Sequence, residues 1–297
     1  MGLMLTPEIL RPMSYRILPA LLGLTVATTL LGCETPATTT TEDTSPTVTD
    51  ATETGTLALL GNAEERPQVG FTSVDGWALS FDHIYVHFSD LRAYQVDPPY
   101  DYSTLTPIQG AQVEVSFPDQ TVDLVTGDED NPTVPIATLT DAPTGHYNAI
   151  SWQMTPAPDG PSAGSSLVII GTAERDGETI AFTLNLEKEF SYYCGEFIGD
   201  ERQGILAAGE AAEVEATLHF DHLFGEGSKP ADDPINQTAL GFDPLAALAV
   251  DGQVEVDFAT LQAVLTPADL ERLESSLAAL GHAGEGHCFE AISGQTS

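Results

Sequence analysis

The sequence predicts a mainly β protein, an antiparallel β-sandwich with a small helical C-terminal extension. Three observations support this fold class. Short runs of alternating apolar and polar residues fill the middle of the chain, turn residues separate these runs, and one amphipathic helical pattern follows near the end. The 297 residues suffice for one or two domains with a buried core.

The first predicted strand has the clearest pattern. Trp77, Leu79 and Phe81 alternate with small or polar residues, and after Asp82-His83 the alternation continues one position later. A period-two pattern that slips by one residue predicts a strand with a β-bulge near Asp82-His83.

Further β-like runs follow, and turn residues such as Pro118-Asp119 separate them. The runs cover residues 112–117, 121–125, 134–139, 147–154, 166–173, 179–186 and 214–220. Asp176-Gly177 lies between two runs and predicts a two-residue β-hairpin. We expect these strands to form the β-sandwich domain, residues 57–220.

Residues 221–297 predict a mixed, helical C-terminal extension packed on the sandwich. Thr266 is suited to cap a helix and Pro267 to occupy its first position. Leucines then recur at helical spacing, and Gly281 ends the pattern. A shorter helix is expected over residues 244–249.

The first 33 residues have the features of a secretory signal. Arg11 and Arg16 precede an apolar segment, residues 17–31, which is shorter than the roughly 20 residues that a membrane-spanning helix needs. The last two residues of this segment and the two that follow it, Leu30-Leu31-Gly32-Cys33, resemble the lipobox of bacterial lipoproteins.

The lipobox resemblance implies that residues 1–32 are a signal peptide, from a start at Met1 or Met13, and that Cys33 carries the lipid. It further implies that the protein contacts a membrane through this lipid. Glu34 in the next position favours the outer membrane of the cell envelope, on the periplasmic face or at the cell surface.

A Thr-rich acidic tether, residues 33–56, separates the expected anchor from the β-sandwich. Its side chains are mostly Thr, Asp, Glu, Ser and Pro, and such a segment has too little apolar surface to fold by itself.

The charge excludes some function classes. The chain has 45 acidic and 9 Lys or Arg side chains, a formal net charge of −36. A nucleic-acid-binding protein needs a basic surface that replaces counterions at phosphates, and this composition offers none. Binding to anionic lipid through a polybasic patch is excluded for the same reason.

Two cysteines remain once Cys33 is assigned to the lipid. In an exported protein, Cys194 and Cys288 most simply form a disulfide. The alternative is two free thiols, one of which is a metal ligand.

Two short histidine clusters are the best candidates for a binding site. The first contains His219, Asp221 and His222, and the second, beside Cys288, contains His282, Glu285 and His287. Neutral imidazole and carboxylate groups suit Zn²⁺ or Cu²⁺ where three or four of them converge. In the alternative interpretation these histidines only cap a helix or bind buried carbonyl groups.

Two other candidate metal sites are weaker. His83 and His87 share one face of a predicted strand, but about 13 Å separates positions i and i+4 at 3.3 Å per residue. Asp251-Gly252 matches the middle of an EF-hand loop, whereas Ala247, Ala249 and Phe258 occupy positions that need ligands. Calcium binding there is not expected.

The chain also resembles a group of uncharacterised lipoproteins with a β-sandwich domain of unknown function. The resemblance rests on Asp75-Gly76-Trp77, on residues 219–224 and on a GHxGEGHC motif at residues 281–288. It implies a fold and a location. The H-E-x-x-H signature of metalloproteases is absent.

We therefore expect a lipid-anchored envelope binding protein that holds a divalent transition metal through its C-terminal histidines. A structural or adhesive module without a metal is the first alternative. A metal-dependent enzyme with Glu285 as the base is the second. The sequence does not identify a protein partner or a small ligand.

Overall fold

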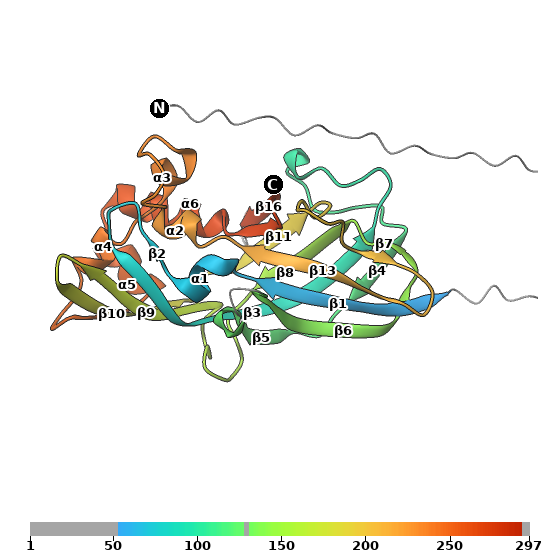
Figure 1. Ribbon diagram of the computed structural model, residues 1–297, viewed down its shortest axis with the longest axis horizontal. Helices are drawn as coiled ribbons and strands as arrows, with labels where there is room; N and C mark the ends of the chain where they lie inside the picture. The colour runs from blue at the N-terminus through green and yellow to red at the C-terminus, as the bar shows by residue number, and fades with distance from the viewer. Residues whose placement is uncertain (1–52, 128–130, 293–297) are drawn as a thin grey trace, which may run out of the picture. The chain divides into compact units, whose positions relative to one another are not determined.

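The computed structural model describes residues 53–127 and 131–292 (Figure 1). Strands make up 46% and helices 18% of the structure, which confirms a mainly β fold. The expected signal peptide, Cys33 and the tether up to residue 52 lie outside the described residues. The end of the tether was predicted wrongly, because residues 54–56 already belong to the first strand.

The strands are β1 (Thr54–Asn62), β2 (Phe71–Thr72), β3 (Ala78–Gln95), β4 (Val113–Ser116), β5 (Gln120–Asp123), β6 (Thr133–Pro143), β7 (Gly145–His146), β8 (Ala149–Met154), β9 (Leu167–Arg175), β10 (Glu178–Leu186), β11 (Phe190–Cys194), β12 (Ile205–Leu206), β13 (Ala211–Leu218), β14 (Gln253–Asp257), β15 (Gly281–Ala283) and β16 (Gly286–Ile292). The helices are α1 (Glu65–Val69), α2 (Asp221–Phe224), α3 (Pro234–Thr238), α4 (Asp243–Ala246), α5 (Phe258–Val264) and α6 (Pro267–Ala278), with short 3-10 helices η1 (Tyr102–Thr104) and η2 (Leu124–Thr126).

The main sheet is mixed and curls into a half-barrel, which differs from the antiparallel sandwich that we predicted. Its strand order is β14-β10-β9-β3-β8-β11-β16-β15-β13-β1-β6, with β2, β4 and β5 also paired to β3. β1 pairs with β13 in parallel, and so does β10 with β14. The alternation of side chains along a strand is the same in parallel and antiparallel pairs, so the sequence pattern could not reveal these directions.

The longest strand, β3, connects two parts of this sheet. Its first half pairs with β9 and its second half with β8. The register with β9 shifts between Phe81 and His83, which confirms the predicted bulge. An extra residue at this point bends the strand and allows it to follow the curl of the sheet.

Two other local predictions are confirmed. β9 and β10 are joined by Asp176 and Gly177, whose φ angles are 53° and 85°, as a two-residue hairpin requires. Helix α6 begins after Thr266, whose side chain accepts a hydrogen bond from the backbone N–H of Asp269. The short helix expected at residues 244–249 is α4, which begins one residue earlier, at Asp243, and ends at Ala246.

The helices α2 to α6 gather at one end of the sheet, on the left in Figure 1. Aromatic side chains fill this part of the core, where Phe242 lies 5.3 Å from Trp77 and 5.2 Å from Phe182 between ring centroids. The Asp75 carboxylate accepts hydrogen bonds from the backbone N–H groups of Phe242 and Asp243, at 2.7 and 2.6 Å. These contacts hold the helical layer against the start of β3.

The C-terminal segment is more than an extension packed on the sheet, because it contributes strands β14, β15 and β16 to it. β16 lies between β11 and β15. Cys288 of β16 is directly opposite Cys194 of β11, and the two sulfur atoms are at disulfide distance. This agrees with the predicted pairing of the two cysteines.

Replacing Cys194 and Cys288 together with alanine should lower the free energy of unfolding by about 4–5 kcal/mol, because a crosslink across this long loop restricts the unfolded chain. Urea unfolding of the oxidised protein and of the double variant measures this difference. Wild-type protein reduced with dithiothreitol should unfold like the variant. Two reactive thiols in unreduced, denatured Cys33→Ser protein would contradict the prediction.

Candidate metal centre

The candidate metal centre lies where β13, α2 and the β15–β16 hairpin meet. His219 directly follows β13, and His282 lies in β15, whose residues pair with the last residues of β13. On a continuous strand His219 and His222 would face opposite sides. Strand β13 instead ends at Leu218 and α2 begins at Asp221, so the chain turns His222 back toward the other two histidines.

His219, His222 and His282 form a compact group. One possible ligand atom from each lies within 4.8 Å of the others. The rings of His219 and His282 are stacked, with centroids 4.1 Å apart, and the His222 ring lies 5.1 Å from that of His282. His219 and His282 are buried, whereas His222 is half-buried. The structure thus brings together histidines from both predicted clusters.

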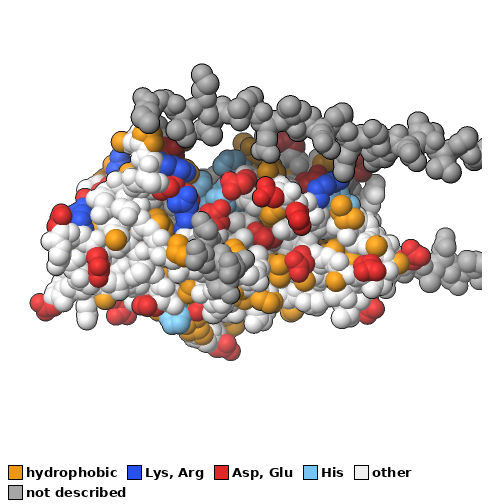
Figure 2. Space-filling view, viewed as in Figure 1, with side chains coloured by type: hydrophobic (Ala, Val, Ile, Leu, Met, Phe, Trp, Pro, Cys, Tyr) orange, Lys and Arg blue, Asp and Glu red, His pale blue; other side chains and the backbone are white. Residues whose placement is uncertain are grey.

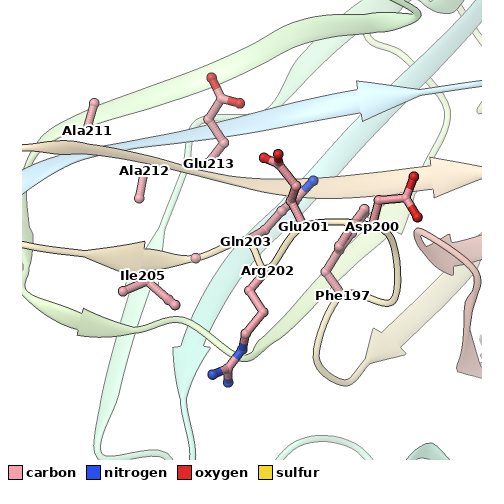
Figure 3. A pocket seen from close by; sticks show the side chains of 10 residues that line it. Phe197, Asp200, Glu201, Arg202, Gln203, Ile205, Ala211, Ala212 and Glu213 are labelled. Carbon is pink, nitrogen blue, oxygen red and sulfur yellow. The ribbon is translucent and has the colours of Figure 1, made fainter. Parts of the chain in front are cut away.

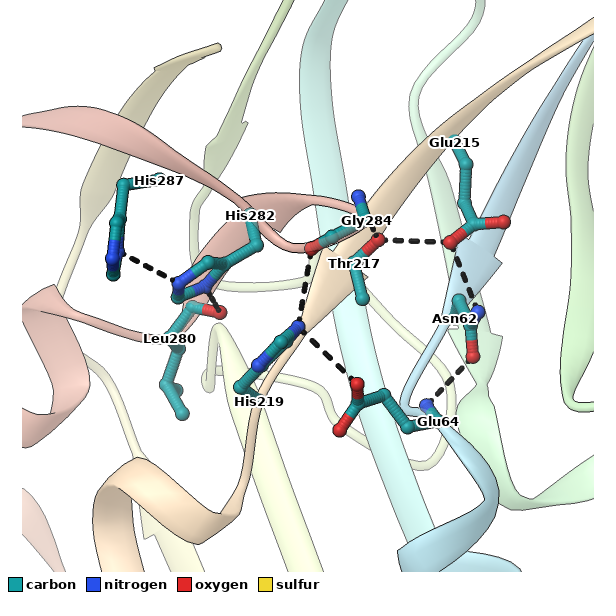
Figure 4. Close-up of polar contacts among 9 residues, drawn as sticks. All are labelled: Asn62, Glu64, Glu215, Thr217, His219, Leu280, His282, Gly284 and His287. Atoms are coloured by element: carbon teal, nitrogen blue, oxygen red, sulfur yellow. Dashed lines mark hydrogen bonds and ion pairs between the residues drawn. The ribbon is translucent and has the colours of Figure 1, made fainter. Parts of the chain in front are cut away.

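Hydrogen bonds to carbonyl groups define which nitrogen of two rings carries the proton. His282 Nδ1 lies 3.2 Å from the carbonyl oxygen of Leu280, and His219 Nε2 lies 3.2 Å from that of Gly284 (Figure 4). A carbonyl oxygen only accepts, so these two nitrogens donate. The lone pairs of the neutral rings are therefore on His282 Nε2 and His219 Nδ1.

His287 completes the group from β16. Its Nδ1 lies 3.0 Å from His282 Nε2, so it donates a hydrogen bond to that lone pair. His287 is exposed, and its ring is 6.0 Å from that of Tyr102.

Burial favours the neutral form of two of these rings. Burial, followed by repulsion between protonated His282 and protonated His219, lowers the pKa of His282 to about 3, although the hydrogen bond to Leu280 acts in the opposite direction. Burial likewise lowers the pKa of His222, against the opposing effect of Asp221. Neutral imidazole is the form that binds a metal ion.

A closed circuit of hydrogen bonds supports His219 (Figure 4). The Gly284 N–H donates to Thr217 Oγ1, and the Thr217 hydroxyl donates to the buried Glu215 carboxylate. Asn62 Nδ2 donates to the same carboxylate oxygen, and Asn62 Oδ1 accepts from the backbone N–H of Glu64.

The Glu64 side chain closes this circuit, because its Oε1 lies 3.5 Å from His219 Nε2. The circuit connects the end of β1, the end of β13 and the β15–β16 turn. It holds Glu64 at a φ of 62°, a left-handed conformation that is rare for a residue other than glycine.

A cleft of about 370 Å³ opens beside His219. It is lined by Glu64, Arg66, His219, Asp221, Lys229, Ile235 and Glu285. Figure 2 shows histidine side chains next to acidic and basic ones on this face. Burial raises the pKa of the Glu64 carboxyl, His219 opposes this shift, and the like charges of Asp221 and Glu285 add to it.

The two cations of this cleft are already paired with one carboxylate. Arg66 and Lys229 each lie 3.0 Å from Glu226. Burial disfavours ionisation of Glu226, but hydrogen bonds from Ser228, Lys229 and Arg66 outweigh it and lower the pKa of Glu226 to about 2.

Sequence reasoning missed Glu64, Asn62, Glu215 and Thr217, which come to the site through the pairing of β1 with β13. No local pattern marks them, since two of them lie more than 150 residues from the other two. The predicted residues Asp221 and Glu285 do line the cleft, beside His219.

The other candidate residues have separate environments. His83 Nδ1 lies 2.7 Å from Asp123 Oδ2, and His87 Nδ1 lies 2.9 Å from Thr121 Oγ1. Asp251 and Gly252 form a tight turn that leads into β14, and Phe258 begins α5.

A second cleft, of about 510 Å³, lies at the edge formed by β12 and β13 (Figure 3). It is also acidic, with Asp200, Glu201 and Glu213 in its lining, but these carboxylates are exposed and no histidine lines the cleft. Its exposed carboxylates therefore provide a control for the carboxylates in the cleft beside His219.

Comparisons with known proteins identify no relative. No family model, curated protein or solved structure matches the chain. Within the described residues, no helix has the length and apolar character needed to cross a membrane.

We expect acid to destabilise the protein through His282. Between its pKa of about 3 in the folded protein and its ordinary value of 6.5, the unfolded chain binds a proton that the folded protein does not. Stability should therefore fall as the pH decreases from 7 to 4, by about 3 kcal/mol for this group.

Urea unfolding of chelator-treated protein across this pH range measures the effect. His282→Asn should weaken the dependence on pH. An identical pH dependence in wild type and His282→Asn would contradict the assignment.

Proposed function

We propose that this protein is a lipid-anchored cell-envelope protein that binds one Zn²⁺ or Cu²⁺ ion through His219, His222 and His282. The observation that carries the metal proposal is the orientation of the ring protons. His219 and His282 each donate one ring N–H to a backbone carbonyl, which leaves the other nitrogen available to a metal. Histidine ligands in metalloproteins typically have such a hydrogen bond, because it fixes the tautomer and the orientation of the ring.

The donor set favours a transition metal over Ca²⁺ or Mg²⁺. Imidazole nitrogen suits Zn²⁺ and Cu²⁺, whereas Ca²⁺ and Mg²⁺ prefer oxygen. Three histidines provide part of a coordination shell, and a fourth position remains for His287, a water molecule or a ligand.

Metal binding requires two local changes. The hydrogen bond between His287 Nδ1 and His282 Nε2 has to break, because the same lone pair would bind the metal. The stacked rings of His219 and His282 also have to turn, because a metal binds in the plane of an imidazole ring and parallel rings do not point to one ion. His287 is exposed and can move without disturbing the core, whereas His219 and His282 have to turn in buried surroundings.

The envelope location rests on the sequence at the N-terminus. The lipobox residues Leu30-Leu31-Gly32-Cys33 and the preceding apolar segment support lipidation of Cys33. The disulfide distance between Cys194 and Cys288 supports a compartment in which disulfides form. We propose the outer membrane, on its periplasmic face or at the cell surface.

The purified protein should retain about one equivalent of Zn²⁺ or Cu²⁺ after loading and desalting, as expected for a site with three protein ligands. His222→Asn should lose most of this metal, because His222 is one of the three proposed ligands, and its side chain is only half-buried. His83→Asn is the control and should retain it. Elemental analysis measures the content.

If neither metal is retained by wild-type protein, the histidines are a structural hydrogen-bonded cluster. Equal retention by wild type and His222→Asn would place the metal elsewhere in the molecule.

Cys33→Ser should move the protein from the membrane fraction to the soluble fraction, because the lipid is its proposed anchor. Fractionation of cells labelled with a radioactive fatty acid tests this. Wild type should carry the label and the variant should not. A labelled variant, or a wild type without label, would contradict lipidation at Cys33.

A further inference from the structure

Three carboxylates from distant parts of the chain line the cleft beside His219. Glu64 comes from the end of β1, Asp221 from the first position of α2 and Glu285 from the turn between β15 and β16. The backbone conformation of Glu64 and the circuit through Asn62 and His219 fix the first of them in place.

The nearby cations Arg66 and Lys229 attract Asp221, but their direct ion pairs are with another carboxylate. Arg66 and Lys229 form their ion pairs with Glu226, at 3.0 Å each. Among the described residues, the only ion-pair contact of Glu64 is with His219, which lies 3.5 Å away. The three carboxylates therefore leave the cleft with an excess of negative charge.

Asp221 is the strongest sign that a cation belongs here. It is 5% exposed and lines the cleft, and its Oδ1 atom has no hydrogen-bond partner among the described residues. A buried carboxylate without a partner is energetically costly, and such groups are normally paired or coordinate a metal.

We propose that Glu64, Asp221 and Glu285 bind a second divalent cation, one that prefers oxygen ligands, such as Ca²⁺ or Mn²⁺. Carboxylate oxygens are the preferred ligands of these ions, and a cleft of about 370 Å³ leaves room for the water molecules that complete their coordination. This cation is distinct from the one proposed at the histidines and does not require it.

The two sites share a boundary at Glu64. Its carboxylate contacts the nitrogen of His219 that does not bind the transition metal. A cation held by Glu64 would leave the lone pair of His219 Nδ1 free, so both ions can be bound at the same time.

Calorimetric titration of the chelator-treated full chain with Ca²⁺, and the same titration with Mn²⁺, tests the proposal. At least one of the two ions should bind with a stoichiometry of one. The triple variant Glu64→Gln, Asp221→Asn and Glu285→Gln should bind it about tenfold more weakly or worse, a change that corresponds to about 1.4 kcal/mol or more.

A matched control exists in the second cleft. Asp200→Asn, Glu201→Gln and Glu213→Gln remove the same three charges from exposed positions and should leave the affinity nearly unchanged. An equal loss in both triple variants would show attraction by the overall negative charge and would overturn the proposal. Absence of binding by both ions would also overturn it.

Two single variants separate the carboxylate site from the histidine site. Asp221→Asn should bind the cation more weakly, because it removes a buried carboxylate that lines the cleft. His222→Asn should bind Ca²⁺ or Mn²⁺ like wild type even where its Zn²⁺ site is lost. Loss of Ca²⁺ or Mn²⁺ binding in His222→Asn would assign that ion to the histidines and overturn the second site.

Discussion

The pairing of β16 with both of its neighbours is the interaction on which the rest of the structure depends. β16 joins β11 on one side to β15 on the other, so it connects the part of the sheet around β3 to the part around β1 and β13. Cys194 and Cys288 lie at disulfide distance across the first junction, and Thr217 accepts from the Gly284 backbone near the second. Because His282 and His287 face each other across the β15–β16 hairpin, the pairing that closes the sheet also assembles the site.

The site combines two environments that differ in chemistry within a short distance. His219 and His282 are buried, and each has a ring N–H donated to a backbone carbonyl, that of Gly284 or Leu280. The adjacent carboxylates are held in a cleft where Arg66 and Lys229 are already occupied by Glu226. Under the two proposals made above, nitrogen ligands on one side and oxygen ligands on the other would allow the molecule to discriminate between classes of metal ion. Glu64 touches both environments and is fixed by the hydrogen-bond circuit that passes through Glu215.

The sequence predicted the structure correctly where interactions between neighbouring residues determine it. The bulge at Asp82-His83, the Asp176-Gly177 hairpin and the cap at Thr266 each follow from a few neighbouring residues, and all three are present. The half-barrel was not foreseen, because it depends on parallel pairs between distant strands. For the same reason the histidine clusters could be found as candidates, whereas Glu64 and its hydrogen-bond partners could not.

The parallel pairing of β1 with β13 has a consequence for the order of folding. The paired residues, such as Leu57 and Ala212, are far apart along the chain, whereas β9 and β10 are joined by two residues. Closing so long a loop costs conformational entropy before any contact compensates for it, so this pair should form late. The imidazole and thiol groups would then remain exposed in a partly folded intermediate. The availability of free metal ions and oxidants during that interval would decide whether the chain reaches its native ligand set or a kinetic trap.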